Sequence, residues 1–158
     1  MNITRNSQNN MLTEILTTLY KRDLARLKDE INAYRDEAAL WKTDREIPNS
    51  GGNLCLHLLG NLNHFIGATI GNSGYARQRD LEFSSKDVPR SELVKRIEDT
   101  IAVVENALRA VTPEQLREEF PLLVFAEKTS TEYMLVHLAT HLAYHLGQIN
   151  YHRRLLDV

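Results

Sequence analysis

The histidines are the residues of this sequence best suited to chemistry, because imidazole binds transition-metal ions and exchanges protons near neutral pH. All six lie in two short segments of the 158-residue chain. NLCLHLLGNLNHFIG, at 53–67, contains His57 and His64, and VHLATHLAYHLGQINYHRRL, at 136–155, contains the other four. This clustering makes the two segments the first candidates for a functional site.

The second segment has the spacing of a helix with one polar stripe. Its stripe residues follow steps of four, four, three and four, and they are His137, His141, His145, Gln148 and His152. At about 100° per residue these side chains fall on one side of the helix. The leucines of the segment centre about a quarter turn away, so the stripe borders the side that faces the core. We therefore expect some of these imidazoles to be partly buried.

Metal binding would satisfy several buried imidazoles at once. Each ring needs a partner for both nitrogens, and neighbouring protonated rings would repel one another. Two histidines four residues apart can bind one ion, and a third ligand should come from a facing helix. His57 is suited to that position, since it lies among Leu54, Leu58 and Leu62. The spacing alone leaves open whether His137 or His145 is the partner of His141.

Other polar residues of the two segments are candidates for the surroundings of the ion. Gln148 can orient a ligand imidazole or bridge two helices. Asn61 and His64 follow His57 by one and two helical turns, so either can reach the rim of the site. His137, where it is not a ligand, is expected in the second shell of the site. His152, near the end of its helix, is expected at the surface.

The segment RQRDLEFS contains a separate group of charged residues, which are Arg77, Arg79, Asp80 and Glu82. A group of this composition can clamp a substrate, or it can be a solvated patch of salt bridges, which is the common case in surface loops. We expect the solvated patch.

Four helices are needed to place these side chains. Apolar residues recur at helical spacing over 11–36, from about 52 to about 70, over 91–110 and over 131–156. Asn49 or Ser50 can cap the second helix, and Ser130 or Thr131 the last. The stretches 42–51 and 71–89 have the Gly, Pro and polar residues of connections. The pattern predicts an antiparallel four-helix bundle with long crossover connections, formed by one domain over 11–158 that follows a flexible tail at 1–10.

Composition narrows the class of protein. A chain with 42% apolar residues and a net charge of −2 can bury a core and lacks the basic surface of a nucleic-acid binder. Its apolar runs are too short to cross a membrane and there is no signal segment, so we expect a cytoplasmic protein. The single cysteine, Cys55, offers no thiolate pair, which leaves nitrogen or oxygen as metal ligands.

The segment HLATHLAYHLGQI resembles the H-x-x-x-H-x-G-Q signature of the DinB-like (YfiT-like) superfamily. The stretches NSGGNLCLHLLGNLNHFIG and RQRDLEFS resemble a small uncharacterised subfamily of it, so the similarity covers residues 11–156. The resemblance implies an up-up-down-down four-helix bundle and a homodimer. It also implies that His57, His141 and His145 bind a divalent metal, which selects His145 over His137.

The expected cofactor is one divalent ion, Zn²⁺ or Ni²⁺, because imidazole suits both. Three histidines leave a coordination position open, as in catalytic zinc sites. We therefore expect a metal-dependent enzyme, either a transferase that uses a small thiol or a hydrolase, although the sequence identifies no catalytic residue. The alternatives are a non-catalytic metal-binding dimer, acting as a stress or interaction module, and a metal-free bundle with a hydrogen-bonded polar seam.

Overall fold

The structure is all-helical, as the sequence predicts. The computed structural model describes residues 3–158, with side chains from Met11 onward. Its elements in chain order are α1 (Ile3–Ala33), η1 (Glu37–Trp41), α2 (Gly51–Leu62), η2 (Asn63–Ala68), α3 (Arg79–Ser84), α4 (Arg90–Ala110), α5 (Pro113–Arg117) and α6 (Thr131–Leu156). Over this range there are two isolated bridges, Asp44 with Ile47 and Glu119 with Ser130, and no strand.

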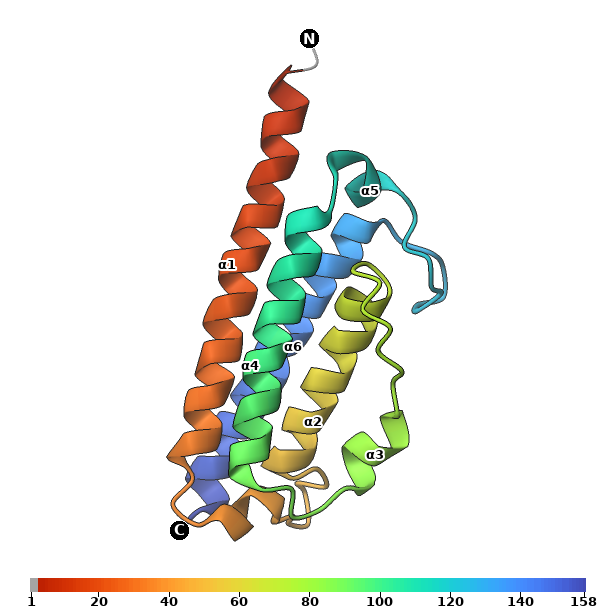
Figure 1. Ribbon diagram of the computed structural model, residues 1–158. Coiled ribbons are helices and arrows are strands. Elements are labelled where there is room, and N and C mark those ends of the chain that lie inside the picture. Colours follow the sequence, from red (N-terminus) through yellow and green to blue (C-terminus); the bar gives the residue numbers. More distant parts are fainter. Residues whose placement is uncertain (1–2) are drawn as a thin grey trace.

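Four long helices lie side by side and enclose the core (Figure 1). α1 packs mainly against α4 and α6, and α2 packs against the same two helices. α1 and α6 run from the end marked N toward the end marked C, whereas α2 and α4 run the opposite way (Figure 1). α2 and α6, which carry the histidines, are therefore neighbours that run in opposite directions.

The order of helix directions differs from the expected up-up-down-down arrangement. Along the chain, Figure 1 shows down, up, up, down. The connection between α1 and α2, residues 34–50, turns back at one end of the molecule, so these two helices run in opposite directions. The connection 69–89, which contains α3, crosses the length of the molecule and makes α2 and α4 parallel.

The helix boundaries follow from local capping. Ser50 Oγ accepts a hydrogen bond from the Asn53 N–H at 3.1 Å, and Ser130 Oγ accepts one from the Tyr133 N–H at 3.2 Å. Of the residues considered at these two positions, the serines are thus the caps. The first helix begins at Ile3 instead of near residue 11. The expected tail at 1–10 lies outside the residues whose side chains are described.

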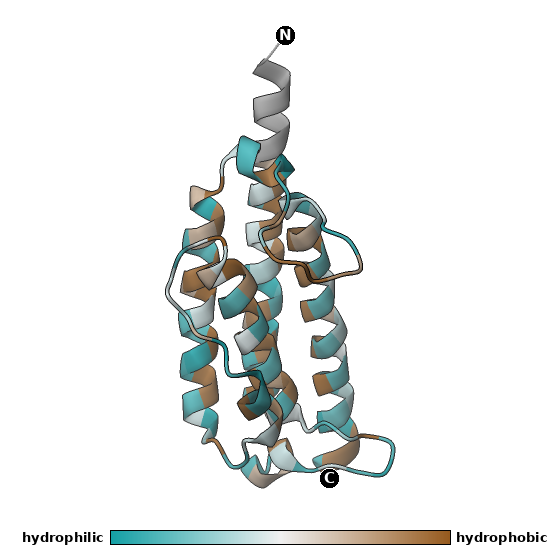
Figure 2. Cartoon of the chain, turned by 90° about the vertical axis from the view of Figure 1, so that its right-hand side faces the viewer, coloured by the Kyte–Doolittle hydropathy of each residue, from teal (hydrophilic) through white to brown (hydrophobic). Residues whose placement is uncertain are grey.

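The core is built from the apolar sides of the long helices, and polar and apolar residues alternate around each helix (Figure 2). Its largest fully buried side chains are Tyr20, Tyr34, Phe120, Leu24, Leu27, Ile31, Leu40, Leu58, Leu62, Ile66, Leu93 and Ile97. Every residue of α2 is buried. A Cβ at Gly52 would lie 2.7 Å from the Trp41 ring, so a glycine there lets η1 pack directly on α2.

Within residues 3–158, no helix combines the length and the apolar character needed to cross a bilayer.

Candidate metal centre

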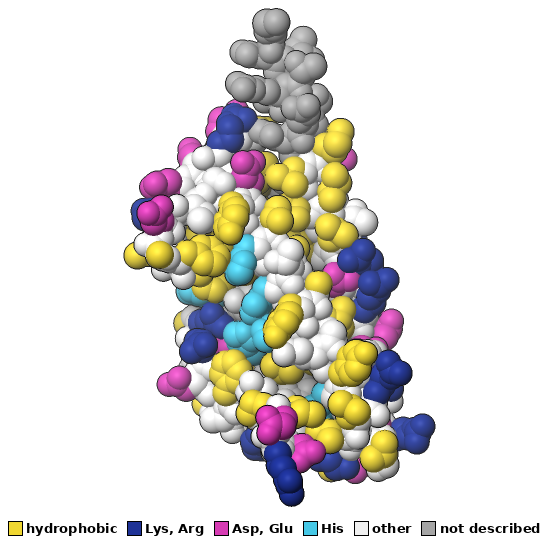
Figure 3. All heavy atoms as spheres, turned by 180° about the vertical axis from the view of Figure 1, so that it is seen from behind, with side chains coloured by type: hydrophobic (Ala, Val, Ile, Leu, Met, Phe, Trp, Pro, Cys, Tyr) yellow, Lys and Arg dark blue, Asp and Glu magenta, His cyan; other side chains and the backbone are white. Residues whose placement is uncertain are grey.

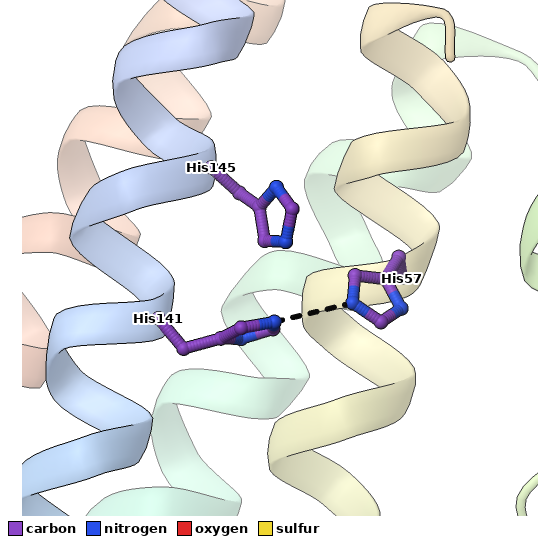
Figure 4. A group of neighbouring side chains, drawn as sticks. All are labelled: His57, His141 and His145. Atoms are coloured by element: carbon purple, nitrogen blue, oxygen red, sulfur yellow. Dashed lines mark hydrogen bonds between the residues drawn. The ribbon is translucent and has the colours of Figure 1, made fainter. Parts of the chain in front are cut away.

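Three histidines meet between α2 and α6. His57 comes from α2, His141 and His145 come from successive turns of α6, and the three rings point toward one another (Figure 4). One nitrogen from each ring can be chosen so that the three nitrogens lie within 4.8 Å of one another. Within the described residues, this is the group of side chains arranged to hold a metal ion. His57 is buried, and His141 and His145 are partly buried.

The spacing of the nitrogens fits one ion. His57 Nε2 and His141 Nε2 are 3.3 Å apart. Two nitrogens bound tetrahedrally to Zn²⁺ at 2.0–2.1 Å would be separated by about 3.3 Å. Two neutral imidazole nitrogens also form at most one hydrogen bond with each other, so without a metal the third ring gains no partner from the other two. The donor set therefore fits a divalent transition metal.

A buried carboxylate orients His57. His57 Nδ1–H donates to Glu82 Oε2 at 3.0 Å, which leaves Nε2 free to face the other two histidines. Arg77 holds the same carboxylate from its other side, donating from Nε and Nη2 at 2.7 and 2.9 Å. Glu82 is 5% exposed. A carboxylate behind a ligand imidazole fixes the tautomer and raises the basicity of the ring.

This arrangement corrects the expectation of a solvated salt-bridge patch at residues 77–82. Arg77 and Glu82 form a buried ion pair that touches His57. The carboxylate can approach because α2 has Gly60 beside it, where any Cβ would overlap the Glu82 side chain. Arg79 lies apart from the pair, with its guanidinium 5.6 Å from the centre of the Phe83 ring.

Gln148 orients His145. His145 Nδ1–H donates to Gln148 Oε1 at 2.6 Å, and Gln148 Nε2 donates to the Tyr144 hydroxyl at 3.3 Å. With Nδ1 occupied, the free nitrogen of His145 is Nε2. The structure thus gives Gln148 the first of the two roles considered for it, the contact with an imidazole. Tyr144 completes this chain of hydrogen bonds.

The charge state of the site suits metal binding. Burial lowers the pKa of His57, although the hydrogen bond to Glu82 opposes the shift. Burial, together with repulsion from His145 and His57, lowers the pKa of His141 to about 4. Both rings are therefore neutral at pH 7, which is the form that binds a metal ion.

Two buried polar atoms in this region have no protein partner. His141 Nδ1 and Asn61 Oδ1 are buried without a hydrogen bond in the described structure. Asn61 is 7% exposed and lies one turn after His57 in α2. Such atoms are ordinarily satisfied by an ordered water or an ion, which is consistent with a hydrated site.

The remaining predicted residues are not part of the group of three histidines. His137 packs edge-on against Phe125, with ring centres 4.8 Å apart, and its ring centre is 6.3 Å from that of His141. His64 packs against Phe65 at 4.8 Å. The geometry groups His145, not His137, with His57 and His141. Roles for His137, His64 and Asn61 at the rim stay predictions.

His152 is not the surface residue that the sequence suggested. It is 2% exposed, its Nε2–H donates to the Lys42 carbonyl at 2.9 Å, and its Nδ1 accepts from the Tyr34 hydroxyl at 2.7 Å. It ties α6 to the residue after α1 and to the residue after η1. Cys55 is fully buried, and burial raises the pKa of its thiol to about 12, so it is a core residue.

The site opens on one face of the molecule. Seen from behind in Figure 3, histidine side chains reach the surface near the middle of this face, with hydrophobic side chains around them. The partial exposure of His141 and His145 agrees with this view. A small molecule could therefore approach an ion held by the three rings.

Comparison with known proteins gives a family without an assigned activity. Residues 7–157 match the family described as "Protein of unknown function (DUF1572)". No curated protein matches the chain.

Proposed function

This chain belongs to the DUF1572 family, and we propose that it binds one divalent transition-metal ion through His57, His141 and His145. The observation that carries the proposal is the convergence of three imidazole nitrogens from two helices, each within 4.8 Å of the others. The hydrogen bonds of His57 to Glu82 and of His145 to Gln148 support it, since metal-bound histidines almost always donate their second N–H in this way. Zn²⁺ or Ni²⁺ suits such ligands.

The proposal extends to the superfamily and the assembly. The H-x-x-x-H-x-G-Q segment and the four long helices support membership of the DinB-like superfamily, with its four-helix bundle. A homodimer is supported by apolar side chains exposed on α6 and the segment before it, which are Leu122, Leu123, Val124, Tyr133, Val136, Tyr144, Tyr151 and Leu155. A monomer mass in light scattering at micromolar concentration would refute the dimer.

A metal-dependent enzyme is the activity that this site supports best. A bound metal ion with an open position can polarise a substrate or activate a thiol or water for attack. Glu82 and Gln148 hold two of the ligand rings in place, and Arg77 pairs with Glu82. His137 and His64, at the rim, are the groups available to accept a proton. We therefore propose a thiol-dependent transferase or a hydrolase.

Elemental analysis tests the metal site. We expect protein purified without a histidine tag to contain about one equivalent of a divalent metal, and the double variant His57→Ala, His141→Ala to contain almost none. His64→Ala, a histidine of the same segment outside the group of three, is the matched control and should keep the metal. Equal metal contents in the wild type and the double variant would eliminate the site.

The alternative is a non-catalytic protein in which the ion joins α2 to α6. It is favoured by the fact that the ligands come from two neighbouring helices. An activity assay distinguishes the enzyme from the non-catalytic protein. It measures turnover of thiol and amide substrates by protein loaded with Zn²⁺, Ni²⁺ or Mn²⁺. If no substrate is turned over and chelation sharply lowers the melting temperature, the structural role is correct and the enzyme is not.

A further inference from the structure

A cavity is lined in part by residues one helical turn from His57 and from His145. It has a volume of about 270 Å³ and is enclosed by the loop before α2, the start of α2 and the last turns of α6. Its apolar walls include Ile47, Pro48, Leu54 and Leu155. Small-molecule sites in proteins commonly measure about 300–1,000 Å³, so this cavity, just below that range, suits only a small ligand.

The cavity adjoins the site through both helices. Leu54, in its wall, is three residues before His57, and Gln148, also in its wall, is three residues after His145. At a rise of 1.5 Å per residue, each is about 4.5 Å along its helix from a metal ligand. Gln148 contacts both regions, because its Oε1 accepts from His145 Nδ1 at 2.6 Å. The cavity and the site therefore share the side chain of Gln148.

The charges around the cavity disfavour an anion. Glu46 is the charged carboxylate in its lining, and the lining contains no Lys or Arg among the described residues. The cations nearby have other partners. Lys42 Nζ donates to the Leu156 carbonyl at 3.1 Å, Arg153 Nε is 2.8 Å from Glu30, and Arg154 lies 5.6 Å from the centre of the Tyr151 ring.

His152, the histidine of the lining, has a pKa lowered by its burial, so its ring is neutral at pH 7. Its Nε2–H donates to a carbonyl, and its Nδ1 accepts from a hydroxyl. It thus adds no positive charge to the cavity. A carboxylate or phosphate placed there would lose its hydration without gaining a cation.

We propose that this cavity is the substrate pocket of the metal site, and that it takes a small neutral or cationic molecule with a compact apolar group. The apolar group packs against Ile47, Leu54 and Leu155, and the reactive end points past Gln148 toward the three histidines. The role of the metal in this inference rests on the proposed function. The binding of a molecule in the cavity does not depend on it. The two parts can therefore be tested separately.

The first test uses metal-free protein in EDTA at pH 7.5, with 1-hexanol, hexylamine and hexanoate as probes. We expect the first two to shift the backbone amide signals of the lining residues and hexanoate to bind at least fivefold more weakly. Leu155→Trp should abolish the shifts, because Leu155 is 56% exposed and a larger ring there can fill the cavity. Ile47→Trp, on another part of the lining, should do the same.

Two further variants make the first test specific. Ile15→Trp places the same ring on an exposed residue of α1, outside the cavity lining, and should leave binding unchanged. Glu46→Gln should narrow the difference between hexylamine and hexanoate. The proposed pocket would be wrong if all three probes bound equally, or if the shifts persisted in Leu155→Trp and Ile47→Trp.

The second test uses protein loaded with Co²⁺ and a series from ethanethiol to hexanethiol, followed by visible absorption. We expect affinity to rise by up to about fourfold per added methylene, and the rise to vanish in Leu155→Trp. Affinity independent of chain length would overturn the link between pocket and metal. If Co²⁺ does not bind at all, the proposed metal function fails, and the first test still decides whether the cavity is a binding site.

Discussion

At the scale of single residues, the site depends on groups that the histidine pattern does not contain. The helical spacing of His141 and His145 and the apolar neighbours of His57 were enough to predict which rings meet, once the motif resemblance had selected His145. Glu82 could not be predicted in the same way. It lies in a connection without periodicity, and its only signal was a cluster of charges, which is ordinarily solvated.

Glu82 should control metal affinity through His57. In Glu82→Gln, the side chain keeps its size but loses the charge that raises the basicity of the ring, so we expect Zn²⁺ affinity to fall about 10- to 100-fold. Competition titration with a chromophoric chelator measures this change. Glu92→Gln, which removes an exposed carboxylate paired with Arg96, is the matched control and should bind Zn²⁺ like the wild type.

The buried Arg77 would lose its partner in Glu82→Gln, and an unpaired buried charge destabilises a protein. The double variant Arg77→Gln, Glu82→Gln removes both charges and separates the two effects. We expect it to recover stability while Zn²⁺ binding stays weak. Wild-type affinity in a folded double variant would show that the carboxylate does not act on the metal.

At the scale of elements, the sequence predicted the long helices and their caps well. Apolar spacing is a local signal, and Ser50 and Ser130 act within their own helices. Helix direction is not local. Both connections are long and polar, and nothing in their composition distinguishes the one that turns back at one end, 34–50, from the one that crosses the molecule, 69–89.

Gly147 lies inside α6, where glycine lowers helix stability. A glycine inside a helix often permits close packing, but a Cβ at this position would meet no atom within 4 Å. Gly147→Ala should therefore raise the free energy of unfolding by about 0.5–1 kcal/mol, without a clash. Urea denaturation measures the change. The matched control is Gly60→Ala, which should be destabilising because the new Cβ would displace Glu82; a destabilised Gly147→Ala would contradict the open space seen here.

At the scale of the whole molecule, the histidines make the fold sensitive to acid. Four histidines have pKa values below the ordinary 6.5, and burial is the main cause in each: His57, His64, His141 and His152. The unfolded chain takes up protons on these rings near pH 6.5, whereas the folded chain does so only at lower pH. Their contribution to stability is therefore complete above pH 6.5 and is lost as the pH falls toward the folded pKa values, which for His141 is about 4.

We expect the free energy of unfolding of the metal-free protein to fall between pH 7.5 and 5.5. Each fully buried neutral imidazole contributes up to about 1.4 kcal/mol to this fall, and the partly exposed His64 and His141 contribute less. In His57→Ala, His141→Ala, two of the four rings are gone, so about half of the pH dependence should remain. Urea denaturation in EDTA at pH 7.5, 6.5 and 5.5 gives the slope of the free energy of unfolding against pH for the wild type and for the variant. Equal slopes for wild type and variant would mean that the two ligand histidines are not held neutral by the fold, and that the protein does not present them ready for a metal ion.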